Sequence, residues 1–366
     1  SPLYDLSGYV LDIILIIGLV TAFFMGLVAL VQNDIKRIIA YSTISQLGYM
    51  TVALGATYYS FAIFHLLTHA FFKALLFLCA GSIIMKCHHE QNIDKMGGLR
   101  KLMPYTFYTY LIGAFSLVGF PMFSGFYSKD IIIDLFKYEN NMIVYSFLVF
   151  GIFVTTLYTF KILFKVFFGN NKLNIQPTEK VEHDDVIIIP LLALSVPSLI
   201  IGFSLFDAVL FTGFFNISIS DYSQVNQIYN EFIISSYAFT LHAFTTLNFF
   251  LLILGIYIAY LLYYKNIKLK DSFVNILALP TKILKGEYGF TYMSDVVIPN
   301  KFKKISSILW EKTDVVIIDN FIVNGIAKKI RAAASSMRLI QTGFIYHYAF
   351  AMIIGLLLFL LFFYRF

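Results

Sequence analysis

Three basic side chains recur at a spacing of four residues inside one apolar stretch of the chain. They are His65, His69 and Lys73. On a helix this spacing places all three on one face, about 6 Å apart along the axis at each step. An imidazole accepts a proton at one nitrogen and donates from the other near neutral pH, and a lysine shielded from water releases its proton more readily. The pattern predicts a proton relay on the face of a membrane helix.

Two other interpretations of the histidines remain open from the residues alone. Histidines at this spacing also occur in zinc sites of the HExxH type, but the glutamate is absent here and no third ligand is close in the sequence. The imidazoles could instead hydrogen-bond neighbouring helices in a structural role. His88 and His89, which precede Glu90, lie in a charged loop, where a solvated surface is favoured over a metal site. We expect no bound metal.

Lys129 and Asp130 follow helix-breaking residues in the apolar stretch 105–136. The helix-breaking residues are Gly119, Pro121 and Gly125. A broken membrane helix persists only where protein or a wet cavity satisfies the freed backbone groups, and ionisable residues there mark ion pathways. Residues 105–118 supply only about 21 Å of helix before the break, so we expect Lys129 to be buried near the middle of a bilayer core of about 30 Å. Asp130 is a candidate counter-ion, although adjacent helical residues point about 100° apart.

The composition indicates a multi-pass membrane protein. Of the 366 residues, 59% are hydrophobic and 13% are charged. With about 20 apolar residues per span, we predict an all-α fold with about eight transmembrane segments. They lie near residues 9–32, 38–56, 60–85, 105–136, 143–168, 186–211, 236–264 and 344–364. The fourth segment is the discontinuous one.

The net charge of +6 is interpreted as a topology signal rather than a nucleic-acid-binding surface, because the basic residues concentrate in loops. The positive-inside rule places four regions on the cytoplasmic or matrix side. These are Lys36 with Arg37, residues 86–101, residues 165–180 and the lysines from Lys265 onward. We interpret Lys36 and Arg37 as topology anchors at the start of the second span.

The segment between the last two spans carries a helical stripe. Its apolar residues are Ile318, Ile322, Ile326, Ile330 and Met337, with polar and basic residues on the opposite face. Pro299 predicts a break ahead of the stripe, and a continuous helix over residues 301–341 would be about 60 Å long. The stripe fits a helix lying among lipid headgroups or a strap across neighbouring subunits. Periodicity leaves both open.

Four stretches in order carry a family resemblance. They are residues 32–50 (QNDIKRIIAYSTISQLGYM), 64–77 (FHLLTHAFFKALLF), 88–100 (HHEQNIDKMGGLR) and 125–130 (GFYSKD). Together they resemble the chain 5 family of NADH-ubiquinone oxidoreductase, the distal antiporter-like subunits of respiratory complex I. The ending at residues 339–355 is similar to the terminal helix of that family.

The resemblance implies roles for the candidate residues. Lys129 matches the lysine at the discontinuous helix of the exit half-channel, and His65, His69 and Lys73 match the central hydrophilic axis. The segment 265–343 resembles the family's lateral helix, which contacts neighbouring antiporter-like subunits; this favours the strap. The chain would take part in proton translocation coupled to NADH:ubiquinone oxidoreduction without a redox site, with NADH, FMN, iron–sulfur clusters and ubiquinone on other subunits. The sequence has no glycine-rich fingerprint after a strand and no cysteine cluster.

The resemblance also suggests four parts: an antiporter-like repeat at 1–168, further spans at 169–264, the lateral segment at 265–343 and an anchor at 344–366. The family's subunits have further spans upstream that contain the first half-channel. We therefore expect either a partial chain or a separate polypeptide, packed beside residues 1–90, that supplies a lysine and a carboxylate. Other expected partners are membrane-arm subunits and phospholipids, and no nucleic acid.

The expected location is the mitochondrial inner membrane, or alternatively a bacterial plasma membrane, with the lateral segment on the matrix or cytoplasmic side. Two other functions remain open. Mrp-type cation/proton antiporters resemble the same repeat, although the lateral segment and the ending disfavour them. A structural role is the other, in which this chain only scaffolds the membrane arm.

Overall fold

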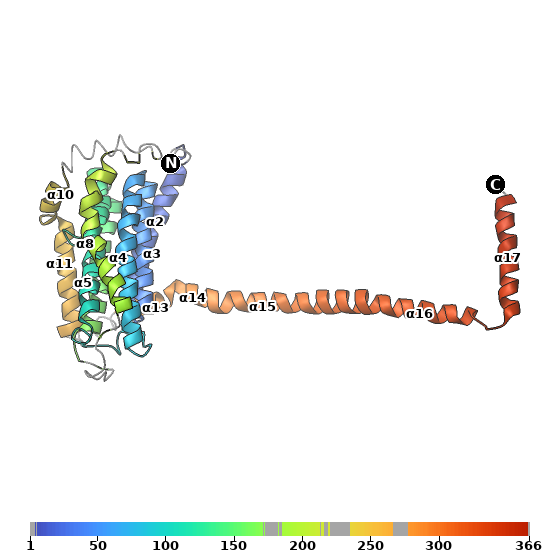
Figure 1. Ribbon diagram of the computed structural model, residues 1–366. Helices are drawn as coiled ribbons and strands as arrows, with labels where there is room; N and C mark the ends of the chain where they lie inside the picture. The colour runs from blue at the N-terminus through green and yellow to red at the C-terminus, as the bar shows by residue number, and fades with distance from the viewer. Residues whose placement is uncertain are drawn as a thin grey trace. The chain divides into compact units, whose positions relative to one another are not determined.

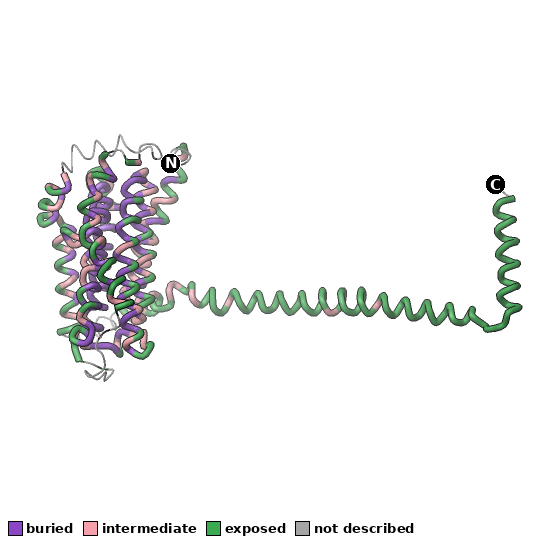
Figure 2. Tube along the Cα trace, in the orientation of Figure 1, coloured by how far each residue is buried: buried purple, intermediate pink, exposed green. Residues whose placement is uncertain are grey.

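The computed structural model describes residues 4, 6–170, 172, 182, 185–212, 214–215, 219, 235–265 and 277–364. They form two units, Ser1–Tyr288 and Gly289–Phe366, and each is considered by itself. Within the described residues the chain is helical and contains no strand, as the sequence predicts. In the first unit the helices stand side by side as a bundle with a buried interior (Figure 1; Figure 2).

The helices of the first unit overlap the first seven predicted spans, except α13, which lies in the predicted lateral segment 265–343. They are α2 (Gly8–Val31), α3 (Ile35–Gly55), α4 (Tyr59–Lys86), α5 (Pro104–Val118), α6 (Ile131–Tyr138), α7 (Met142–Ile162), α8 (Asp185–Leu210), α10 (Ser236–Ala243), α11 (Leu247–Tyr260) and α13 (Ala278–Lys285). Short π-helical turns precede α6 (Phe126–Asp130) and extend α7 (Leu163–Phe167) and α11 (Leu261–Lys265). Among the described residues of the whole chain, six helices are long and apolar enough to cross a membrane. The chain is a multi-pass membrane protein.

Small residues let α2 and α3 pack closely. A Cβ atom at Gly18 of α2 would lie 2.6 Å from the backbone nitrogen of Val52 in α3. Ser45 of α3 donates a hydrogen bond of 2.6 Å to the carbonyl of Ala22. Membrane helices commonly associate in this way, because small residues allow backbones to approach and hydroxyl groups can bond across the interface. Two other polar residues of α3, Ser42 and Gln46, bond to side chains of α4.

The fourth span is interrupted as predicted. Helix α5 ends at Val118, and Gly119 adopts a left-handed conformation with φ of 83°, which glycine tolerates without steric cost. The chain resumes helical form only at Ser124. The hydroxyl of Ser116 accepts a hydrogen bond of 3.0 Å from the Gly125 amide across the break. One freed backbone group is thus satisfied within the protein.

The seventh span differs from the sequence prediction. The sequence predicts one helix over 236–264, whereas α10 ends at Ala243 and α11 begins at Leu247. Thr246 caps α11 by accepting a hydrogen bond of 3.4 Å from the Phe249 amide. A threonine hydroxyl can compete with the helical backbone for such bonds, and this favours a new helix start over continuation.

The second unit is a run of helix without a core of its own. It comprises α14 (Phe290–Tyr292), α15 (Ile298–Leu309) and α16 (Asn324–Ile340), joined by π-helical turns at Met293–Val297 and Trp310–Val323, followed by α17 (Ile345–Tyr364). The break predicted at Pro299 is wrong: the chain is helical on both sides of the proline, in the π-helical turn Met293–Val297 and in α15. None of these described helices contains a buried residue (Figure 2).

Candidate functional site

The three basic residues of α4 are all buried. His65, His69 and Lys73 turn toward the bundle interior, as their spacing predicts. His65 Nε2 lies 3.2 Å from Gln46 Oε1 of α3, and His65 Nδ1 lies 2.9 Å from the hydroxyl of Ser128. Because an amide oxygen only accepts, Nε2 carries the hydrogen and Nδ1 accepts from Ser128. His65 therefore connects three segments: α4, α3 and the π-helical turn after the break.

Lys73 marks the far end of this polar line. Its amine donates to the Ser42 hydroxyl and, at 3.5 Å, to the carbonyl of Ile39, both on α3. His69 lies between Lys73 and His65, with the two imidazole centroids 5.9 Å apart. His69 Nε2 is buried and has no hydrogen-bond partner among the described residues. The predicted polar line is thus present on α4, but direct bonds do not close it at His69.

Lys129 lies in the π-helical turn and is 0% exposed. Its Nζ has no hydrogen-bond partner within the described residues and lies 5.3 Å from the ring centroid of Tyr49, a cation–π distance. The sequence prediction that Lys129 is buried at a helix break is confirmed. π-Helical turns inside helices are frequent at functional sites.

Asp130, the next residue, is also buried and lies against the helix break. A Cβ atom on Gly119 would lie only 2.7 Å from Asp130 Oδ1. The carboxylate therefore lies against the left-handed turn that ends α5. The same Oδ1 has no hydrogen-bond partner in the described part of the chain.

Two buried polar residues on α6 and α11 were not anticipated. Asp134 lies one turn beyond Asp130 on α6, and the side-chain amide of Asn248 on α11 donates to its Oδ1 at 3.2 Å. Both side chains are buried. A carboxylate within an apolar membrane segment is itself a signal of function, and it could have singled out Asp134. Nothing in the sequence indicates its pairing with Asn248.

Lys161 on α7 is a further buried cation that the sequence analysis did not single out. Its amine donates to the carbonyls of Leu30 at 2.9 Å and Gln32 at 2.6 Å, and to Asn33 Oδ1 at 3.3 Å. These acceptors lie at the C-terminus of α2, where helical carbonyls lack partners and cations are favourable.

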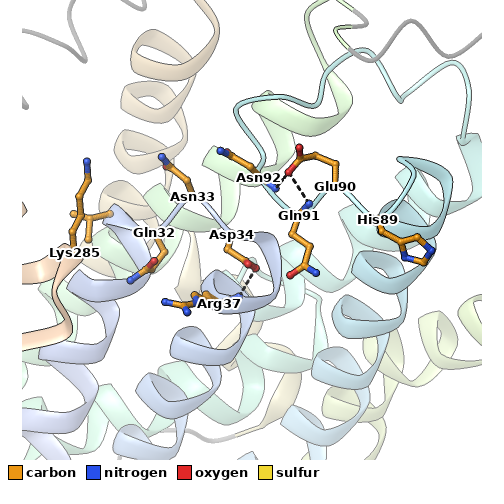
Figure 3. Close-up of a pocket in the computed structure, with 10 residues that line it drawn as sticks. Gln32, Asn33, Asp34, Arg37, His89, Glu90, Gln91, Asn92 and Lys285 are labelled. Carbon is orange, nitrogen blue, oxygen red and sulfur yellow. Dashed lines mark hydrogen bonds between the residues drawn. The ribbon is translucent and has the colours of Figure 1, made fainter. Parts of the chain in front are cut away.

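Lys36 and Arg37 lie outside the buried axis. Both are exposed at the start of α3, and Arg37 forms an ion pair of 3.1 Å with Glu287. Arg37 also lines an open cavity of about 670 Å³ between the α2–α3 turn and the loop after α4 (Figure 3). Their predicted topology role stays a prediction.

The charged loop after α4 forms the other side of that cavity. The amide of Ile35 donates to the Gln91 carbonyl at 3.0 Å, and the amide of Ile93 donates to the Asn33 carbonyl at 2.9 Å. Glu90 accepts from the Asn92 amide at 2.9 Å and pairs with Lys95 at 2.8 Å. Those bonds lower the pKa of the Glu90 carboxyl group, with the Lys95 hydrogen bond contributing most. No group of three His, Cys, Asp or Glu side chains that could hold a metal occurs among the described residues.

Comparison with known proteins shows what this chain is similar to. Residues 1–156 match the model of the family described as NADH:quinone oxidoreductase/Mrp antiporter, transmembrane. Residues 1–156 are therefore similar to that family. The matched region includes the candidate site residues His65, His69, Lys73, Lys129 and Asp130.

Similarity to individual proteins extends beyond the matched region. The NADH-quinone oxidoreductase subunit L of Neisseria meningitidis serogroup A is 40% identical over 98% of this chain and 57% of its own length. The NADH-ubiquinone oxidoreductase chain 5 of Phytophthora infestans is 37% identical over 97% of this chain and 54% of its own. A solved Mrp complex from Dietzia sp. DQ12-45-1b is 21% identical, covering 65% of this chain and 50% of that one, with a TM-score of 0.48. The chain spans about half the length of the curated relatives it matches.

Proposed function

We propose that this chain is the C-terminal half of a proton-translocating membrane-arm subunit of a respiratory NADH:quinone oxidoreductase. The observation that carries the proposal is the bond between His65 and Ser128, which links the basic residues of α4 to the turn that holds Lys129. Relatives named as subunits of that enzyme, similar over nearly the whole chain, support it.

The proposed path begins at Lys73 and runs along α4. A proton released from Lys73 passes through His69 to His65, where Nδ1 accepts it, and then reaches Lys129 beside Ser128. Two ammonium groups about 8 Å apart at an effective dielectric of about 20 would repel each other by about 2 kcal/mol. Protonation at one end of the path therefore favours release at the other, and this couples neighbouring sites without a redox centre in this chain.

The proposal includes partners on both sides of the chain. The first half-channel, with its own lysine and carboxylate, packs beside residues 1–90. Neighbouring antiporter-like subunits and phospholipids cover the apolar residues of α15, α16 and α17, which are exposed in the second unit. NADH, FMN, iron–sulfur clusters and the quinone belong to other subunits, in a mitochondrial inner membrane or a bacterial plasma membrane.

The deciding experiment replaces Lys129 in the assembled complex in native membranes. Lys129→Ala should abolish the protons that pass through this subunit and so lower the number pumped per NADH oxidised. The matched control is Lys101→Ala, because Lys101 is exposed before α5. Normal pumping by a fully assembled Lys129→Ala complex would favour a scaffold role. Sodium/proton exchange by this chain without any NADH-oxidising partner would favour an Mrp-type antiporter.

A further inference from the structure

Acidic side chains follow α6 from the helix break to its end. Asp130 and Asp134 are one turn apart and buried, and Glu139 follows the last residue of the helix. Glu139 accepts a hydrogen bond from the phenol of Tyr58, which lies in the turn between α3 and α4. That turn is at the opposite end of the bundle from the basic loops at residues 32–37 and 86–101 (Figure 1). The acids thus lead away from Lys129 toward one end of the bundle.

A second helix contributes to the middle of this row. Asn248, in the first turn of α11, is 1% exposed and donates its amide hydrogen to Asp134. It also lies beside the carboxyl group of Asp130. Its Oδ1 is buried and has no hydrogen-bond partner among the described residues, so it can accept from a protonated carboxyl group or a water.

The break in the seventh span explains how Asn248 reaches this position. Because α11 starts at Leu247, its N-terminal turn, the positive end of the helix dipole, is located at the depth of α6. A continuous helix would present no such end to a carboxylate. The two breaks, after α5 and before α11, therefore meet at one buried cluster of Asp130, Asp134 and Asn248.

We propose that Asp134, held in place by Asn248, carries the proton after it leaves Lys129 and Asp130. In each step one proton moves: an N–H bond of the Lys129 ammonium group breaks as an O–H bond forms on Asp130, and the proton then passes to Asp134 and on to Glu139. A protonated carboxyl group is neutral, so the loaded state places no new charge among apolar side chains. Asn248 orients the acceptor and carries no proton. The inference rests on the proposed function and adds α11 to the release path.

The test uses the assembled complex in native membranes. Asp134→Asn preserves the shape of the side chain and an oxygen for Asn248, but the amide cannot bind a proton at neutral pH. The contribution of this subunit to the number of protons pumped per NADH oxidised should therefore be lost. Asp134→Glu should restore them at least in part. The matched control, Asp185→Asn, removes an exposed acid from the first turn of α8 and should leave pumping unchanged.

Infrared difference spectra separate proton transfer from a merely structural role. During turnover the complex should show a C=O band of a protonated carboxyl group that Asp134→Asn removes. If Asp134→Asn does not assemble, Asn248→Leu and Asp134→Glu decide: we expect reduced pumping in the first and retained pumping in the second, and normal pumping in Asn248→Leu overturns the inference.

The outcomes also separate this inference from the proposed function. Loss of pumping in Lys129→Ala with normal pumping in Asp134→Asn overturns only the release path. Normal pumping in both variants removes the proposed function as well.

Discussion

His65 Nδ1 lies 2.9 Å from the hydroxyl oxygen of Ser128. The contact joins an unbroken helix to the π-helical turn that carries Lys129. Since Nδ1 accepts from Ser128 in the neutral imidazole, a proton arriving at Nδ1 must turn the hydroxyl hydrogen away. The carbonyl of Gly125, 3.4 Å from the hydroxyl oxygen, offers an alternative acceptor. Protonation of His65 is thereby linked to the hydrogen bonding of the broken segment.

Removing this hydroxyl should interrupt proton transfer while the helices remain packed. We expect Ser128→Ala to lower the protons pumped per NADH and to cost only about 1 kcal/mol of stability, the usual value of one hydrogen bond. Ser128→Thr should restore pumping. Pumping and assembly are measured in native membranes, with Ser146→Ala as control, because the Ser146 hydroxyl is exposed and bonds only its own helix at Met142. Unchanged pumping in Ser128→Ala would remove Ser128 from the path.

Lys161 should matter for stability. Lys161→Met leaves carbonyls at the end of α2 without their donor, and a buried unsatisfied polar group costs about 1–3 kcal/mol. The thermal midpoint of the detergent-solubilised protein should fall. Lys101→Met, at an exposed position before α5, should leave it unchanged. An equal midpoint for both variants would contradict the capping role.

Replacing two helical glycines by alanine should have opposite effects on stability, because only Gly18 is closely packed. Gly18→Ala brings a methyl group 2.6 Å from the Val52 nitrogen, and such overpacking costs about 1–3 kcal/mol. Gly81→Ala on α4 meets no atom within 4 Å and should stabilise by up to about 1 kcal/mol through helix propensity. The two variants are compared by thermal denaturation in detergent. A stabilising Gly18→Ala would show that the α2–α3 contact is looser than described.

The loop after α4 should be sensitive to acid. Because Lys95 lowers the pKa of Glu90 in the folded loop, the carboxylate stabilises the loop above the unfolded pKa, and this stabilisation is lost as the pH falls through the lower folded value. The protection of the amides at residues 88–95, measured against their intrinsic exchange rates at each pH, should therefore fall below about pH 4. Glu90→Gln should remove that pH dependence, whereas Glu311→Gln, an exposed residue of the second unit, should not. Identical pH profiles in the native protein and Glu90→Gln would contradict the ion pair.

The local sequence pattern was sufficient to predict most of the helices and part of the candidate site. The spacing of His65, His69 and Lys73 placed them on one buried face because helical periodicity is a property of the chain itself. Gly119 marked the break for the same reason, since its left-handed conformation is a local backbone requirement. The break expected at Pro299 was wrong: helical backbone continues from Met293 into α15 without interruption.

Tertiary structure decided which buried groups meet. Ser128 and Gln46 flank His65 only because α3 and the turn before α6 pack against α4, and Asn248 reaches Asp134 only because α11 begins beside α6. These pairs are separated by 63, 19 and 114 residues along the chain. Periodicity states which face of a helix is buried, but the partner of that face depends on how whole helices pack, and that is set by the summed contacts of the bundle rather than by any local run of residues.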